Sequence, residues 1–408
     1  HAVTSDTECF PGKLVHGHIR WLESHGADRI FFPSISTRKS ENTEKTSVSM
    51  CGIVKGFPFV IKNSDNPEGR GRAAYDAPVF FWYTDIDRDR QLSRFMLDTF
   101  GIKKNLVKKA IREGNAAQAA FSRSLLEQGK KVLDKLEKLE ADRPAGNPSP
   151  IAVVLAARPY QNDDLVNHNI PEMFTEQGID VLTADSIPGL DKIDLRNSRL
   201  DIVNNFHARM LSSAIYAARH KNLEYVQIVS FGCGHDAYLS DEIIRIMKEI
   251  SGKTPLILKV DESDIRGPLS IRIRSFLSTV RMKRERYADA ASRKAQEEYA
   301  VFPPQKQELT QMRRTSPVRR TGLPGEIREL SDPYPQKFRK EDMESGEYVV
   351  FVPNTSHAFS RLMAAVFDGP NVKTVPLPIG RERAIELGKR YVHNDICFPA
   401  QVVIGEAL

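Results

Sequence analysis

The sequence has 408 residues, of which 40% are hydrophobic and 27% are charged, and its formal net charge is +6. This composition is ordinary for a globular protein of two or three domains, and no apolar run approaches the roughly 20 residues that a membrane-spanning helix needs. Four widely spaced cysteines do not form a secreted disulfide pattern, so we expect a cytoplasmic protein whose thiols are reduced or bound to metal.

The first part of the chain alternates between helical and strand-like patterns. A helix followed by a short apolar strand is predicted over residues 13–33, and a polar loop over 34–49. An aromatic strand is predicted at 79–83, and the pattern is helical over 87–142, where Lys and Glu form intrahelical pairs. We expect residues 1–143 to form an N-terminal α/β portion with a helical insertion.

A Pro-rich linker then leads into a regular alternation of apolar strands and helices over residues 150–282. Continuous apolar strands that alternate with helices indicate a parallel sheet covered on both faces, which is a doubly wound α/β domain. The predicted strands are 151–156, 180–183, 226–230 and 256–260, and the predicted helices are 168–177, 200–220, 240–250 and 270–284.

The strand pattern stops over residues 283–347, which are rich in Arg, Lys, Gln, Glu and Pro. We interpret them as a basic, solvated linker rather than a nucleic-acid-binding arm, because few aromatic residues interleave with the charges. Residues 348–408 begin a further α/β unit that is truncated. It has predicted strands at 348–353 and 374–377 and a helix near 357–367.

One short phrase occurs twice in the chain. The first copy is Cys9-Phe10-Pro11-Gly12-Lys13-Leu14-Val15-His16-Gly17, and the second is Cys397-Phe398-Pro399-Ala400-Gln401-Val402-Val403-Ile404-Gly405. Five of the nine positions are identical, which indicates two copies of one cysteine-bearing unit rather than chance.

Three cysteines lie where a loop meets the next element. Cys9 precedes a predicted helix, Cys51 is followed by a glycine, and Cys233 lies between glycines after a predicted strand. In an open α/β sheet, ligands gather at the carboxyl ends of the strands, and the start of the next helix favours a thiolate. The three cysteines therefore suit convergence on one inorganic cluster.

Other chemistries for these cysteines stay open at this point. Structural zinc sites usually contain closely spaced Cys-x-x-Cys pairs, and the sequence has none. A nucleophilic cysteine could use His16, His18 or His235 as its base, but no pairing singles one out. Each thiol could also be a buried, inert side chain. Nucleotide binding at the strand ends is disfavoured because no glycine-rich phosphate loop follows a strand.

Several of these motifs together resemble a known family. They are Cys9 to His18, Cys51 to Pro58, Arg158-Pro159-Tyr160 with Asn167 to Pro171, Phe231 to Asp236, and Asn394 to Ala400. The chain resembles the dehydratase-like (DUF2229, D-component-like) region of large proteins related to activators of 2-hydroxyacyl-CoA dehydratase. These proteins are related to 2-hydroxyglutaryl-CoA dehydratase and to double-cubane cluster proteins. The resemblance covers nearly the whole chain except the basic linker.

The resemblance implies an anaerobic iron–sulfur protein with doubly wound domains around a shared cluster site. Cys9, Cys51 and Cys233 would hold a [4Fe-4S] cluster, and Cys397 would belong to a second, half-present metal site. Low-potential electrons would come from an ATP-hydrolysing activase domain in the same full-length chain. The electron transfer would drive reduction or radical dehydration of an acyl-CoA-type substrate, as in a lyase or oxidoreductase component. Whether two chains pair as a homodimer to complete a cluster stays open.

Three further residues are candidates for catalysis at the strand ends. Arg158 follows the first strand of the α/β domain and His168 opens the next helix, so both could hold an anion or donate a proton toward the cluster. His235 stands beside Cys233 and could hydrogen-bond to a cluster sulfur. A helix-capping or surface role is the alternative for both histidines.

One position departs from the family pattern. Relatives tend to carry a cysteine after Phe-Pro at the end of the first strand, where this chain has Ser34. A serine oxygen is a poorer ligand for a soft metal site. The second hypothesis is therefore a non-catalytic structural or regulatory module, in which the cluster site is degenerate and the region docks the activase domains.

Overall fold

The fold is seen in a computed structural model, which describes residues 3, 8–42, 48–200, 202, 204–230, 232–263, 266–299, 349–354, 356–370, 372–378, 382–392 and 398–408, with backbone alone for 289–299 and 357. These residues form an α/β structure whose strand pairs within sheets are all parallel, as the sequence predicts. Among the helices described, none combines the length and apolar sequence needed to cross a bilayer.

The central domain contains a four-stranded parallel sheet with the strand order β6-β5-β7-β8. Its strands are β5 (Ala152–Ala156), β6 (Asp180–Thr183), β7 (Leu223–Ser230) and β8 (Leu256–Val260). The predicted strands 180–183 and 256–260 are confirmed residue for residue. The strand order reverses between β5 and β7, so the crevice for a ligand in this type of sheet lies where these two strands end.

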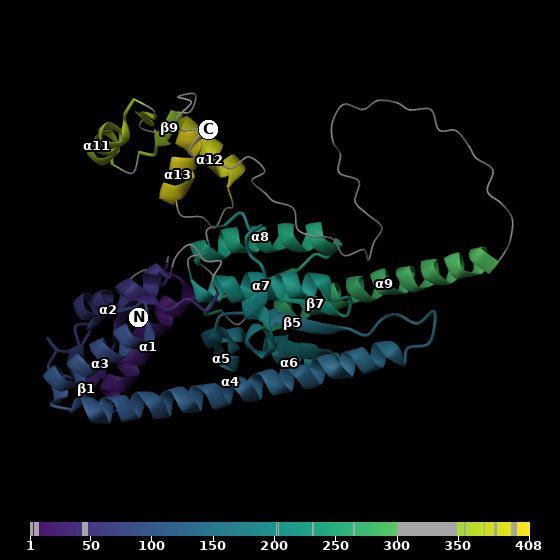
Figure 1. The fold of residues 1–408 in the computed structure, drawn as a ribbon, viewed down its shortest axis with the longest axis horizontal. Coiled ribbons are helices and arrows are strands. Elements are labelled where there is room, and N and C mark those ends of the chain that lie inside the picture. Colours follow the sequence, from purple (N-terminus) through teal and green to yellow (C-terminus); the bar gives the residue numbers. More distant parts are fainter. Residues whose placement is uncertain are drawn as a thin grey trace.

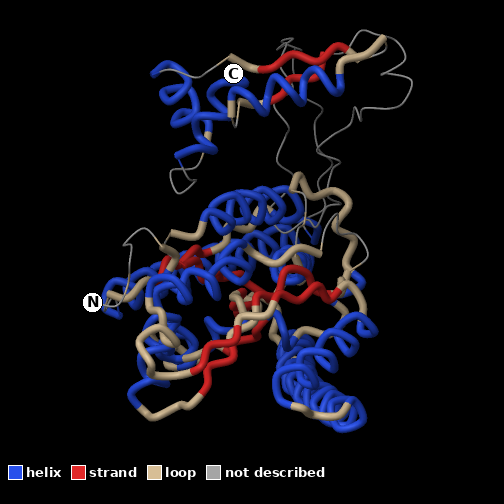
Figure 2. The backbone as a smooth tube through the Cα atoms, turned by 90° about the vertical axis from the view of Figure 1, so that its left-hand side faces the viewer, coloured by secondary structure: helices blue, strands red, loops and turns tan. Residues whose placement is uncertain are grey.

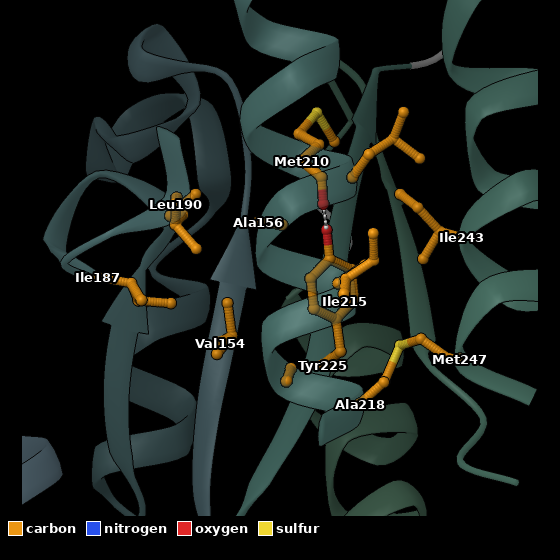
Figure 3. Close-up of a cluster of buried hydrophobic side chains, with 14 of the residues drawn as sticks. Val154, Ala156, Ile187, Leu190, Met210, Ile215, Ala218, Tyr225, Ile243 and Met247 are labelled. Atoms are coloured by element: carbon orange, nitrogen blue, oxygen red, sulfur yellow. Dashed lines mark hydrogen bonds between the residues drawn. The ribbon is translucent and has the colours of Figure 1, made fainter. Parts of the chain in front are cut away.

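Helices cover both faces of this sheet. Buried residues of α7 (Asn205–Arg219) and α8 (Gly234–Ser251) form one core with β5 and β7, and residues of α6 (Ile170–Thr175) and α9 (Arg266–Tyr299) form the other. Figure 3 shows the first core, in which the buried Tyr225 hydroxyl donates a hydrogen bond to the Met210 carbonyl at 2.8 Å. The doubly wound fold is therefore present, with an apolar layer on each side of the strands.

Short helical segments connect these elements. They are α5 (Asp164–Asn167) and the three 3₁₀ helices η1 (Pro159–Asn162), η2 (Ala184–Ser186) and η3 (Leu190–Lys192).

The N-terminal unit has two short parallel ribbons flanked by helices. Its elements are α1 (Phe10–Ser24), β1 (Arg29–Phe31), β2 (Ser34–Arg38), α2 (Gly52–Ser64), β3 (Ala74–Asp76), β4 (Val79–Trp82), α3 (Asp85–Phe100) and α4 (Lys104–Ala141). Strand β1 pairs with β3 and β2 pairs with β4. The 38-residue α4 runs from this unit along the central domain (Figure 1), where Leu133 and Leu136 enter the core.

Two sequence predictions need correction. Residues 34–49 were expected to be a polar loop, but Ser34–Arg38 form β2, because the backbone of this polar segment pairs with β4. The helix expected at 270–284 is α9 and continues to Tyr299, so the first part of the predicted linker 283–347 is helical. The rest of that linker, from residue 300, lies outside the described residues.

The C-terminal unit contains β9 (Val349–Val352), α11 (His357–Phe367), β10 (Lys373–Pro376), α12 (Glu382–Tyr391) and α13 (Phe398–Ala407). Strands β9 and β10 pair in parallel and form a ribbon separate from the central sheet (Figure 2). The predicted strand–helix–strand order is confirmed. The second cysteine-bearing phrase also begins a helix, since α13 starts at Phe398 as α1 starts at Phe10.

Candidate functional site

Cys9, Cys51 and Cys233 occupy the same local position in three different helices. Each is the residue immediately before the first helical turn, of α1, α2 and α8 respectively, with extended backbone at ψ values of 148°, 157° and 101°. None of the three side chains makes a capping hydrogen bond, and each thiol is free and partly exposed. Unpaired N–H groups and the helix dipole make these positions favourable for a thiolate.

The backbones that carry Cys9 and Cys233 are in close contact. Gly232 has a φ of +77°, and a Cβ at this position would lie 3.2 Å from the Glu8 carbonyl oxygen and 3.3 Å from Cys9 Cα. A glycine therefore permits both the left-handed turn after β7 and the approach of the N-terminal unit to it.

The thiols are also within range of one another's charge. Burial raises the pKa of Cys9, and the neighbouring Cys51 adds to this shift. Burial raises the pKa of Cys233 to about 11, against the effect of the Arg158 cation and in the same direction as Asp236 and Cys9. Burial therefore favours the protonated form of both thiols.

Arg158 lies at the end of β5, where the strand order reverses, and its guanidinium is buried. Its Nη1 and Nη2 donate to Asp236 Oδ2 and Oδ1 at 2.9 and 2.6 Å, and Nη2 also donates to Cys233 Sγ at 3.5 Å. Asp236 is fully buried in the first turn of α8 and also accepts from the Ser230 backbone N–H at 3.1 Å. This forked ion pair ties β5 to the start of α8 and places a cation beside the Cys233 sulfur.

Two neutral histidines lie near this ion pair. The rings of His207 and His235 have centroids 5.1 Å apart and are tilted by 50°. Burial lowers the pKa of His207 to about 3, and the charges of Arg158 and His235 lower it further; burial and then Arg158 also lower the pKa of His235. The buried Nδ1 of His235 has no hydrogen-bond partner among the described residues. Sequence reasoning missed His207, which only the folding of α7 beside α8 brings here.

His168 has a different environment from Arg158 and His235. It ends α5 with a left-handed φ of 56°, and its Nε2 is 2.9 Å from the backbone oxygen of Asp261, which follows β8. The structure therefore brings Arg158 and His235 together with Cys233, and places His168 in a loop that it links to the end of β8.

His16 is held in a buried polar network. Its ring is fully buried, Nδ1 is 2.6 Å from Asp65 Oδ2, and Nε2 is 3.6 Å from Glu8 Oε2. Arg20 Nε donates to Asp65 Oδ1 at 3.1 Å. The network connects α1 to the end of α2. His18, which was also considered as a base, lies at an exposed position on α1.

Ser34 begins β2 and is buried. Its Oγ donates to the Lys55 carbonyl in α2 at 2.7 Å, and its backbone N–H donates to the Pro78 carbonyl at 2.9 Å. Lys55 in turn donates its N–H to the Cys51 carbonyl at 3.2 Å. The serine hydroxyl therefore joins β2 to the first turn of the helix that Cys51 precedes.

The described side chains do not by themselves form a site for a metal ion. Among the described residues, no three His, Cys, Asp or Glu side chains come close enough to hold a single ion. Thiolates at three separate helix starts are soft ligands that can each bind a different iron. Cys397, expected in a second metal site, lies outside the described residues.

Comparison with known proteins gives one family match. Residues 1–187 match the family model described as the CoA enzyme activase uncharacterised domain (DUF2229). The match includes Cys9, Cys51 and Arg158 and ends before Cys233, whereas the resemblance was expected to cover nearly the whole chain. No curated protein and no solved structure matches the chain. The first 187 residues are therefore similar to the CoA enzyme activase uncharacterised domains.

Proposed function

We propose that this region binds an iron–sulfur cluster through Cys9, Cys51 and Cys233 and works with an ATP-hydrolysing activase on an acyl-CoA-type substrate. The proposal is carried by one observation, the placement of three free thiols each directly before a helix. The similarity of residues 1–187 to a CoA enzyme activase domain family supports the partner. When bound, such a cluster supplies low-potential one-electron chemistry and Lewis acidity for reduction or radical dehydration.

The chain's own residues provide the charges that this chemistry needs. The helix N-termini favour thiolates at the three cysteines, and Arg158 Nη2, 3.5 Å from the Cys233 sulfur, lowers the pKa of Cys233 against the larger effect of burial. The bidentate bond to Asp236 fixes the orientation of the guanidinium, so that it can stabilise negative charge that develops beside Cys233. Burial and Arg158 lower the pKa of His235, so its unpartnered Nδ1 is suited to a hydrogen bond with a bound group rather than to binding a proton.

A second candidate is a non-catalytic module that docks activase domains with a degenerate cluster site. Ser34 favours it, because the hydroxyl proton of this residue is used in a hydrogen bond to Lys55. A neutral, hydrogen-bonded serine is a weaker ligand for iron than the thiolate that relatives tend to carry.

Iron and acid-labile sulfide analysis after anaerobic purification separates the two. We expect about four irons and four sulfides per chain, with a visible absorption band that dithionite bleaches. Cys9→Ala, Cys51→Ala and Cys233→Ala should each remove most of the iron, and Cys397→Ala is the matched control that should keep it.

Absence of iron after reconstitution would favour the docking module. Full iron content in Cys233→Ala would contradict the ligand assignment even if the wild-type chain contains a cluster. A large loss in Cys397→Ala would show that this residue completes the first site.

A further inference from the structure

A second candidate site lies at the other edge of the central sheet. A cavity of about 1050 Å³ opens where β7 and β8 begin, away from the strand ends that lead to Arg158 and Cys233. Its walls come from α9, from the loop before β5 and from the loop between α8 and β8. Pockets of this volume are the size that small-molecule ligands occupy.

The lining of this cavity is strongly basic. Glu224 is the one carboxylate among its described lining residues, and Arg284 neutralises it through a buried ion pair of 2.6 Å. The cations that line the cavity are Arg143, Lys221, Lys253, Arg272, Lys283 and Arg284. Arg143 and Lys221 are paired with Glu140 at 3.1 and 2.9 Å. The lining cations without an ion pair among the described residues are therefore Lys253, Arg272 and Lys283, whose positive charge attracts an anion.

Lys253 is held by neutral groups rather than by an ion pair. Its ammonium donates to the carbonyls of Ala217, His220 and Leu223 at 3.0, 2.7 and 2.7 Å, so neutral oxygens use all three of its protons. Burial lowers its pKa to about 8. The carbonyls hold the ammonium in place, and its charge is left to act on the cavity.

Other cations are free to bind a ligand directly. Lys283 is exposed on α9 and makes no hydrogen bond or ion pair within the part of the chain that the structure describes. Arg272 lies one turn before Phe276 on α9. Its Nη2 donates one hydrogen bond to the Ile257 carbonyl, and the side chain is otherwise exposed.

The cavity also has an apolar wall. Phe276, Val280 and Leu256 line its inner side, and the side chains of Ile271 and Tyr287 line it while remaining 70% and 43% exposed. Exposed apolar side chains beside several cations favour a ligand that has both a flat apolar part and several negative charges.

We propose that this cavity binds a nucleotide-class ligand, with its phosphates on Lys283 and Arg272 and its ring against the apolar wall. Inorganic phosphate would leave the apolar wall unused, and the single carboxylate of a fatty acid would pair with only one of Lys283 and Arg272. The binding uses side chains at the amino ends of the strands, so it needs no glycine-rich loop after a strand. The site is distinct from the cysteines and does not depend on the proposed cluster.

Calorimetric titration of the whole chain tests this inference, with ADP and coenzyme A as the two nucleotide probes and pyrophosphate and adenosine as controls. We expect saturable, salt-sensitive binding of ADP, coenzyme A or both, and weaker binding of each control. Which of the two nucleotides binds more tightly distinguishes a free nucleotide from a CoA derivative as the source.

Two variants locate the binding. Lys283→Glu should weaken it at least about tenfold, because attraction to phosphate becomes repulsion, and Tyr287→Ala should weaken nucleotide but not pyrophosphate binding. Lys108→Glu, on the exposed side of α4, is the matched control and should bind like the wild-type chain. Circular dichroism checks that each variant is folded. Absence of nucleotide binding at about millimolar concentration, equal affinity for pyrophosphate, or unchanged binding in Lys283→Glu would each overturn the proposal.

Discussion

Replacing Asp236 with alanine should destabilise the central domain strongly. Asp236 is fully buried and accepts two hydrogen bonds from Arg158 and one from the Ser230 N–H. The variant leaves the Arg158 guanidinium buried, at 8% exposure, without its carboxylate. Breaking a buried ion pair in this way costs about 3–5 kcal/mol, because the remaining charge loses its partner and does not regain water. The free energy of unfolding in urea measures this loss.

Two matched variants make the Asp236→Ala result interpretable. Asp194→Ala removes an exposed ion pair with Arg196 and should cost at most about 1 kcal/mol. The double variant Arg158→Met with Asp236→Leu replaces the buried pair with apolar side chains and should recover most of the stability. A cost below about 1 kcal/mol for Asp236→Ala would refute the conclusion that this pair holds β5 to α8.

The same variant has a second readout at Cys233. The Asp236 charge raises the pKa of this thiol and the Arg158 cation lowers it, although burial has the largest effect. Removing the carboxylate should therefore lower the pKa of Cys233. The pH dependence of iodoacetamide alkylation, followed by mass spectrometry of the Cys233 peptide, measures the shift, and an unchanged profile would show that the Asp236 charge does not act on this sulfur.

Three further changes test the packing around the site. Burial lowers the pKa of His207 to about 3 in the native chain, whereas the ordinary pKa of about 6.5 applies in the unfolded chain. Between these two pH values, the unfolded chain therefore binds a proton at His207 and the native chain does not. Above about pH 6.5 the free energy of unfolding is therefore not reduced by His207. It falls as the pH drops toward 3, by about 2 kcal/mol between pH 7 and 5. Urea unfolding of His207→Leu at both pH values should show a flatter dependence. Gly252→Ala should cost roughly 1–2 kcal/mol because Gly252 has a positive φ. Gly232→Ala should cost more, because Gly232 also has a positive φ and its added Cβ would contact the backbone of Glu8 and Cys9. Equal losses of thermal stability in the two variants would contradict this. Tyr225→Phe should lose about 1 kcal/mol with its bond to Met210, measured by urea unfolding, and no loss would mean that the bond adds nothing net.

The central sheet could be predicted because its two middle strands, β5 and β7, are buried at every position. Residues 151–156 and 226–230 are short, largely apolar runs between helical patterns, and such runs have few alternatives. Strand β2 lacks this signal, since Ser34–Arg38 is largely polar and becomes a strand only by pairing with β4. The continuation of α9 past residue 284 could not be predicted, because the sequence of its later turns is charged and lacks the apolar periodicity that indicates a helix.

The candidate site was only partly predictable for a related reason. The positions of Arg158 and Cys233 follow from the rule that ligands gather where parallel strands end. Their contact through Asp236 depends on the strand order β6-β5-β7-β8, which brings residues 78 positions apart together. His207 has no local signal, because its pairing with His235 arises from the packing of α7 against α8.

The repeated phrase encodes a local structure rather than a complete site. In both copies a helix begins at the Phe that follows the cysteine, with proline in the first turn, a position where its missing N–H costs nothing. The packing that follows differs. A Cβ at Gly405 would overlap the Ala384 carbonyl of α12, whereas one at the equivalent Gly17 would meet nothing within 4 Å. Cys51 reaches the same position before a helix without the phrase, followed by Gly52. Cys9, Cys51 and Cys233 therefore share a position before the N-terminus of a helix, which favours a thiolate. Cys9 and Cys233 come together because the distant segments that carry them pack against each other at Gly232, and not because of the repeated phrase.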